Sequence, residues 1–190
     1  TVLLQMPAMT DVSPVFGAYL RSIYNLHEDG VPARRARVSE RLGQAGPTVS
    51  QTVNRLHDAG LVMIGSDGLL ELTGTGTAFA IASTRRHRLA DRLMTDVLNM
   101  PIQRVHAEAT RWAHSLGRDV ELATARLIGE PWVSPWGNPI PGLDELGIVG
   151  VPDPPAPTML GTLPRTREPV MAVVRLVSED TQDDPQRITE

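Results

Sequence analysis

Apolar residues recur at helical spacing in three short segments of the N-terminal third. Residues 17–29 carry apolar side chains on every turn, and residues 36–43 repeat the pattern over two turns. The third segment opens at Gly46-Pro47 and closes at Gly60. Proline suits the first turn of a helix, and glycine commonly ends one. The pattern therefore predicts three consecutive helices.

A different pattern follows in residues 61–73. Two short apolar runs flank the sequence Gly-Ser-Asp-Gly, which is typical of a β-hairpin. Three helices followed by a hairpin predict a winged helix-turn-helix domain, which we place at residues 1–74.

The third predicted helix has two unlike faces. Val49, Val53 and Leu56 face one side, where they can pack on a core. The other side carries small and polar residues that fit a DNA groove. Gln51 and Asn54 can make bidentate contacts to adenine edges, whereas Thr48 and Ser50 suit phosphates or thymine methyl groups.

Arginines precede or begin the second helix, which crosses the DNA backbone in such domains. The alternative is a helix-turn-helix that contacts only protein. The predicted DNA-binding residues are Arg35, Arg37, Ala45, Pro47, Thr48, Ser50, Gln51 and Asn54.

Residues 75–148 form a second predicted domain, which is helical. Amphipathic segments span residues 75–99, 102–116 and 118–128. Helices that follow a winged helix commonly form a dimer platform, and a dimer suits a palindromic operator. A helical core without a partner is the alternative. The fold is thus predicted to be mainly α with a small β component.

The C-terminal part differs in composition. Residues 149–169 are rich in proline, glycine and threonine and are interpreted as a linker. Residues 170–177 are typical of a β-strand, and a polar, acidic tail follows. Because about twenty residues cannot close a β-barrel, residues 170–190 are interpreted as the start of an incomplete domain.

Composition narrows the class of protein. The 190 residues contain no cysteine, which excludes disulfides and thiolate metal sites. No apolar run is long enough to cross a bilayer, and the first residues lack the charged region of a secretory signal. We therefore expect a cytoplasmic protein without a membrane partner.

Charge is unevenly distributed along a chain whose net charge is −4. Arginines outnumber acidic residues ten to seven in residues 18–92, but are outnumbered eight to fourteen in residues 93–190. A basic N-terminal half suits a DNA-binding module that is joined to a different domain.

Two predicted helices carry histidines that could share a metal ion. His87 and Asp91 are four residues apart on one helix face. On the next helix, His106 and His114 lie eight apart on one face. The alternative for any single histidine is an ordinary core or surface position. His27 and His57 have no such companions and are interpreted as structural.

Catalysis is not expected. A hydrolytic metal needs a neighbouring general base, but Glu108 lies two residues from His106 and points away from it on a helix. The chain has no phosphate-binding glycine loop, nucleophile elbow or HExxH motif. The protein is therefore not expected to be an enzyme or to have a small-molecule substrate.

From about residue 18 to 148, the chain closely resembles the diphtheria-toxin-repressor (DtxR) and iron-dependent-regulator family. The resemblance is carried by YLRSIYNL, RLGQAGPTVSQTVNRL, HRLADRLMTDV, VHAEATRW and NPIPGLDELGI. It implies a dimeric, metal-activated winged-helix repressor of palindromic operators, with Fe²⁺ or Mn²⁺ as the physiological metal and Co²⁺, Ni²⁺ or Zn²⁺ as surrogates. It also implies that residues 170–190 begin an SH3-like domain.

The resemblance implies an ancillary metal site with a nearby anion. Its ligands would be His87, Asp91, His106, Glu179 and Gln182, with Asp91 where glutamate is usual. The anion would be held by Arg88, Ser134 and Asn138.

The family's primary, activating site is degraded in this chain. The positions that correspond to its side-chain ligands are Ala18, Thr110, Ala113 and His114. Alanine cannot ligate, and a neutral hydroxyl is a poor substitute for a thiolate or carboxylate. We therefore predict a repressor that binds metal only at the ancillary site. The alternative is a metal-independent repressor that responds to another signal or to none.

Overall fold

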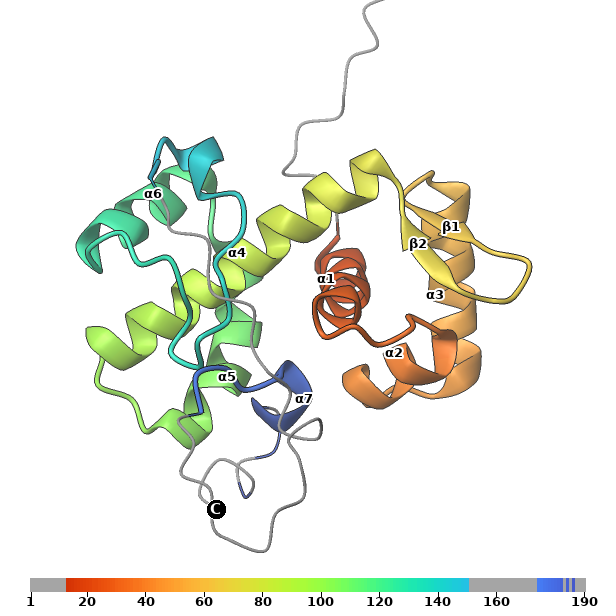
Figure 1. Cartoon of the computed structure of the whole chain (residues 1–190), viewed down its shortest axis with the longest axis horizontal. Helices are drawn as coiled ribbons and strands as arrows, with labels where there is room; N and C mark the ends of the chain where they lie inside the picture. Colours follow the sequence, from red (N-terminus) through yellow and green to blue (C-terminus); the bar gives the residue numbers. More distant parts are fainter. Residues whose placement is uncertain (1–12, 151–173, 183, 185, 187–190) are drawn as a thin grey trace, which may run out of the picture.

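The computed structural model describes residues 13–150, 174–182, 184 and 186. The N-terminal elements are three helices and a hairpin: α1 (Pro14–Glu28), α2 (Arg35–Leu42), α3 (Gly46–Asp58), β1 (Val62–Ile64) and β2 (Leu70–Leu72). The strands pair antiparallel, with Val62 opposite Leu72. This arrangement is the winged helix that the sequence predicts (Figure 1).

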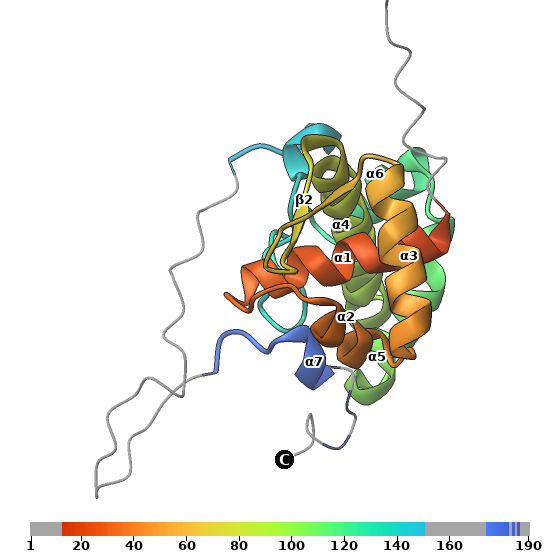
Figure 2. The same ribbon diagram turned by 90° about the vertical axis from the view of Figure 1, so that its right-hand side faces the viewer.

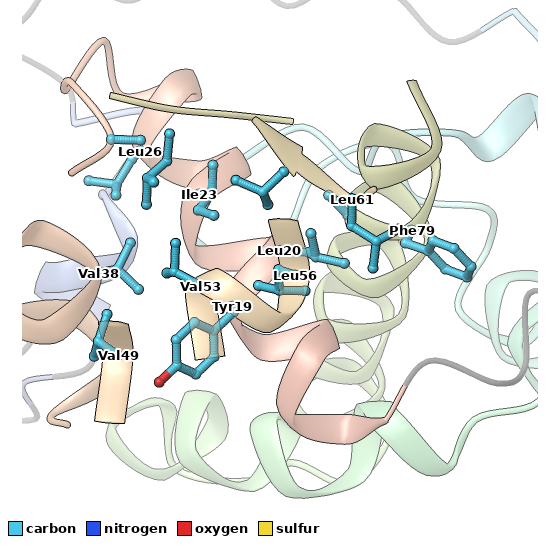
Figure 3. Packing of buried hydrophobic residues seen from close by; sticks show 14 residues of the cluster. Tyr19, Leu20, Ile23, Leu26, Val38, Val49, Val53, Leu56, Leu61 and Phe79 are labelled. Atoms are coloured by element: carbon cyan, nitrogen blue, oxygen red, sulfur yellow. The ribbon is translucent and has the colours of Figure 1, made fainter. Parts of the chain in front are cut away.

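The core of this domain lies where the three helices meet the hairpin (Figure 3). Tyr19, Leu20 and Ile23 of α1 are fully buried. They pack in one cluster with Val49, Val53 and Leu56, the apolar face predicted for the third helix. This packing fixes which side of α3 faces solvent.

A 23-residue helix, α4 (Gly74–Asp96), connects the wing to the rest of the molecule. It runs diagonally from the winged helix to the second helical group (Figure 1). The helix passes close to the wing at Gly76, where a Cβ atom would lie 1.9 Å from the carbonyl oxygen of Leu61. Glycine is therefore required for this approach.

The second helical group consists of α5 (Ile102–Trp112), a 3₁₀ turn η1 (Ala113–Ser115), α6 (Arg118–Leu127) and a second 3₁₀ turn η2 (Leu143–Leu146). The predicted helix 102–116 thus changes to 3₁₀ geometry at Ala113. Arg85 of α4 connects α6 to η2. It is 1% exposed and donates to Glu121 at 2.6 Å, Glu145 at 2.8 Å and the Gly142 carbonyl at 2.6 Å.

The C-terminal segment corrects one prediction. Residues 174–177 are the described part of the predicted strand, and they belong to no strand. Ser178 comes next, and α7 (Glu179–Gln182) follows it. A ladder needs repeated bonds to a neighbouring strand. Val177 instead donates one backbone hydrogen bond among the described residues, to the Trp136 carbonyl at 3.0 Å. Residues 151–173, which include nearly all of the predicted linker, lie outside the described residues.

No helix in the described part of the chain is both long and apolar enough to cross a membrane.

Candidate metal centre and DNA-reading surface

The outer face of α3 is available to a partner. Pro47, Thr48, Gln51 and Asn54 are exposed, whereas Ser50 is half-buried. Ala45 is also exposed and caps the N-terminus of α3. This helix lies at the front of the molecule when the winged helix faces the viewer (Figure 2). The position fits insertion into a major groove.

The two predicted DNA-binding arginines have different surroundings. Arg35 donates to the side-chain oxygen of Asn54 at 3.1 Å, so it lies directly beside the outer face of α3. Arg37 pairs with Glu40 one turn away at 2.8 Å, and both side chains are more than half exposed. Arg37 can therefore exchange this solvated carboxylate for a phosphate at little cost.

A buried cluster of residues that could hold a metal ion lies between α4 and α5. His87 Nε2 is 3.6 Å from an Asp91 carboxylate oxygen and 3.2 Å from His106 Nδ1. One ligand atom from each residue lies within 4.8 Å of the others, and the three residues are 1%, 1% and 4% exposed. The structure thus brings together three of the five predicted ancillary ligands.

The protonation state of His87 suits metal coordination. Burial lowers the pKa of His87 well below its usual value, and the charges of Arg21, His106 and Arg88 lower it further. His87 is therefore a neutral imidazole that can offer a lone pair. Its Nδ1 is buried and accepts or donates no hydrogen bond among the described residues. Two imidazoles and a carboxylate are a donor set that fits a divalent transition metal.

The loop of residues 134–138 encloses the cluster on one side. The Trp136 ring meets His106 edge-on, with ring centroids 5.8 Å apart. Ser134 donates to the side-chain oxygen of Asn138 at 3.2 Å. Gln182, another of the five predicted ligands, is buried and donates to the same oxygen at 2.8 Å. It therefore holds the loop in this structure, while the side chain of Glu179 lies outside the described residues.

Arg88 is placed differently from the other two predicted anion-binding residues. Its guanidinium donates to Glu28 at 2.5 Å and to Asn25 at 3.2 Å, both on α1. It also bonds to the Pro139 carbonyl, next to Asn138. Arg88 thus connects α1 to the loop and already has a carboxylate partner. The sequence did not indicate this pairing, because Glu28 and Arg88 are sixty residues apart.

A second site lies on the adjoining face of α4. Four positions from α1, α5 and η1 line a single cavity of about 400 Å³: Ala18, Thr110, Ala113 and His114. The four positions assigned to the degraded primary site therefore lie together in the wall of one cavity. Its described lining contains no cysteine, aspartate or glutamate. One histidine and one hydroxyl do not fit a transition metal.

Two arginines in the lining of this cavity were missed at the sequence level: Arg21 and Arg86. A signal was present, because Phe79, Ser83 and Arg86 recur at positions i, i+4 and i+7 of α4 and all three line the cavity. His87, the next residue, lies on the neighbouring face of α4. The metal ligands predicted on α4 all lie on that face, so the face of Arg86 received no prediction.

Comparison with known proteins assigns the chain to a family. Residues 11–68 match the family described as iron dependent repressor, N-terminal DNA binding domain. Residues 73–142 match iron dependent repressor, metal binding and dimerisation domain. The chain belongs to the iron-dependent repressor family. The resemblance to diphtheria-toxin-type repressors is thereby confirmed.

Individual members of the iron-dependent repressor family show the same relationship. The chain is 50% identical to iron-dependent repressor IdeR of Mycobacterium tuberculosis over 175 residues, which are 90% of this chain and 75% of that protein. It is 50% identical to the diphtheria toxin repressor of Corynebacterium diphtheriae over 140 residues, which are 74% of this chain and 62% of that protein.

A solved structure also matches. It is that of a manganese-dependent transcriptional repressor in complex with manganese. The two chains are 30% identical with a TM-score of 0.66, over 74% of this chain and 63% of the other.

Proposed function

We propose that the protein is a transcriptional repressor that binds palindromic operator DNA as a homodimer. The observation that carries this proposal is the winged helix, in which packing of Val49, Val53 and Leu56 leaves the polar face of α3 exposed. Gln51 and Asn54 would read bases, and Arg35 and Arg37 of α2 would contact phosphates. The dimerisation domain of the family supports a symmetric pair of such helices.

Divalent metal is the proposed cofactor, and it would bind at His87, Asp91 and His106. Glu179 and Gln182 would complete this ancillary site, with an anion at Arg88, Ser134 and Asn138. In this proposal Fe²⁺ or Mn²⁺ is the physiological metal, since named relatives depend on iron or manganese. The ion would compensate the buried charge of Asp91 and join α4 to α5. No catalytic role is proposed for it.

Calorimetric titration of Mn²⁺ or Co²⁺ tests the metal site. We expect about one ion per protomer, with this binding lost in His87→Ala and in His106→Ala. His57→Ala is the matched control, because this exposed histidine on α3 lies outside the cluster. Two tight sites per protomer, or a site unaffected by His87→Ala, would contradict the assignment.

Operator binding tests the repressor function. A duplex selected from a random-sequence pool with the full chain serves as the probe, and its affinity is measured by fluorescence anisotropy. We expect an inverted repeat, and at least a tenfold loss of affinity in Gln51→Ala and Asn54→Ala from lost base contacts. Glu71→Ala, an exposed position on the wing strand, serves as the control. Failure to select any duplex would refute the proposal.

A second candidate is a metal-independent repressor, which responds to another signal or to none. The absence of an adequate donor set around the described lining of the second cavity favours it. Anisotropy with and without EDTA separates the two candidates. An unchanged operator affinity supports the metal-independent repressor, whereas a loss of affinity in EDTA supports metal control through the His87 cluster.

A further inference from the structure

The cavity beside Ala18 and Ala113 has walls from both parts of the molecule. Ala18 and Arg21 come from α1 of the winged helix, and Arg86 comes from α4. Thr110 belongs to α5, and Ala113 and His114 belong to η1. Its volume of about 400 Å³ lies within the range of small-molecule sites and far exceeds that of a metal ion.

The described lining carries positive charge and no negative charge. Arg21 and Arg86 both contribute to the wall, and neither has a hydrogen bond or ion pair to any residue that the structure describes. The polar groups around them include the Thr110 hydroxyl, the Ser83 hydroxyl and the His114 ring. No carboxylate lies in the described lining. The cavity therefore offers hydrogen-bond donors and positive charge, and no residue that the structure describes supplies a counter-ion inside it.

Of the two arginines, Arg86 gives the stronger evidence for a bound anion. Its side chain is partly buried, and Nε has no partner in the described part of the protein. Burial lowers its pKa from the usual value, against the opposing charge of Glu121. That carboxylate, however, is bonded to Arg85 at 2.6 Å. A desolvated guanidinium without a bonded acid is costly unless a ligand supplies one.

Arg85 shows what the same side chain does elsewhere on α4. It precedes Arg86 directly and is buried, but two carboxylates and a carbonyl satisfy it. Arg88, two residues further, is likewise paired, with Glu28. The two buried arginines of α4, Arg85 and Arg88, thus have bonded carboxylates, whereas Arg86 has none among the described residues.

We propose that this cavity binds a small organic anion, bearing a phosphate or carboxylate group, in place of a metal ion. The guanidinium groups of Arg21 and Arg86 would contact the anionic group, because their planar donor geometry matches phosphate and carboxylate. Thr110 and His114 would contact other polar atoms of the ligand. Such a ligand would touch both the DNA-binding domain and the dimerisation region.

The test is methyl NMR on the full, metal-free chain with ¹³C-labelled alanine methyl groups. Ala18 and Ala113 report from the cavity wall, and Ala125, buried in a separate cluster, reports on the rest of the fold. The probes are inorganic phosphate, glycerol 3-phosphate and citrate, with glycerol as the uncharged control. Comparison of phosphates with citrate distinguishes the two anionic groups.

We expect saturable shifts of the Ala18 and Ala113 signals with at least one anion below about 10 mM, and none with glycerol. Affinity should fall about 10- to 100-fold in Arg86→Gln and in Arg21→Gln, since each removes a charge-assisted contact. Arg86→Lys keeps the charge but loses the planar fork, so it should bind with intermediate affinity. Arg126→Gln, an exposed arginine on α6, is the matched control.

Two results would overturn the proposal. One is the absence of shifts at Ala18 and Ala113 with all three anions. The other is binding that Arg86→Gln, Arg21→Gln and Arg126→Gln weaken equally, which indicates general charge attraction. The Ala125 signal shows whether each variant is folded, and Arg86→Lys retains a test if a glutamine variant is not. Neither result depends on DNA binding.

Discussion

The His87 cluster and the cavity beside Ala113 occupy adjoining faces of α4, yet they differ in every property that decides metal binding. The cluster is closed and contains two imidazoles and a carboxylate within 4.8 Å. The cavity is larger and combines two alanines with two arginines that have no bonded partner in the described part of the chain. One helix therefore supports a site suited to a cation and a site suited to an anion.

We interpret the cavity as the scaffold of the family's primary metal site without its ligands. The four positions of the cavity still meet at one place, because α1, α4 and α5 pack there through a core that does not involve them. The four positions thus share one wall although two of them are alanines. Introducing metal-binding side chains there should therefore create a second metal site.

The largest effect is expected from that restoration, in the triple variant Ala18→Met, Thr110→Cys, Ala113→Glu. A thioether, a thiolate and a carboxylate then join His114, and together they suit a transition metal. Affinity at the cavity should rise from weaker than about 1 mM to about 1 µM, roughly 1000-fold. Calorimetry under reducing conditions should show two ions per protomer instead of one. A stoichiometry that stays at one means that the positions were wrongly assigned.

A second prediction concerns the His87 cluster. Asp91→Asn keeps the side-chain shape but removes the only carboxylate in the described cluster. Removing groups that merely support a metal site typically costs 10- to 100-fold, so loss of a charged ligand should cost at least about 100-fold. Co²⁺ affinity, followed by its visible absorption, measures the effect. Asp96→Asn, an exposed acid on the last turn of α4, is the control.

The features that the sequence predicted correctly follow from the spacing of residues along single helices. The buried face of α3 and the pairing of His87 with Asp91 both follow from 3.6-residue periodicity. The partnership with His106 required only that the next helix pack against α4. Each of these inferences depends on residues within one helix or on neighbouring helices.

Contacts between distant segments account for the part that the sequence did not predict. Arg88 pairs with Glu28, and Gln182 bonds to Asn138, only because tertiary packing brings their segments together. The apolar run before Ser178 resembled a strand because an isolated run does not reveal whether a neighbour will pair with it. Arg86 was missed because its role depends on a cavity formed by three other elements.

A smaller effect is expected from Asn138→Ala. This amide accepts from both Ser134 and Gln182, so its loss frees the end of α7 and loosens the loop around His106. His87, Asp91 and His106 stay in place, because their helices do not depend on this amide. Metal affinity at the cluster should fall about tenfold, in the range of other supporting groups. Asn99→Ala, an exposed position between α4 and α5, is the control in the same titration. A loss as large as that of Asp91→Asn would make Asn138 a ligand.

The smallest effect, and the strictest test of the separation, is expected from His114→Ala. His114 is exposed and lines the cavity, and it is not one of the residues within 4.8 Å of one another in the cluster. One imidazole without a second strong donor does not retain a transition ion. Metal affinity and stoichiometry should therefore change less than about twofold, since sites without shared partners act independently. In the triple variant, by contrast, the same substitution should abolish the added site. A substantial loss from His114→Ala alone would mean that η1 transmits strain between the two regions, and that they act as one site.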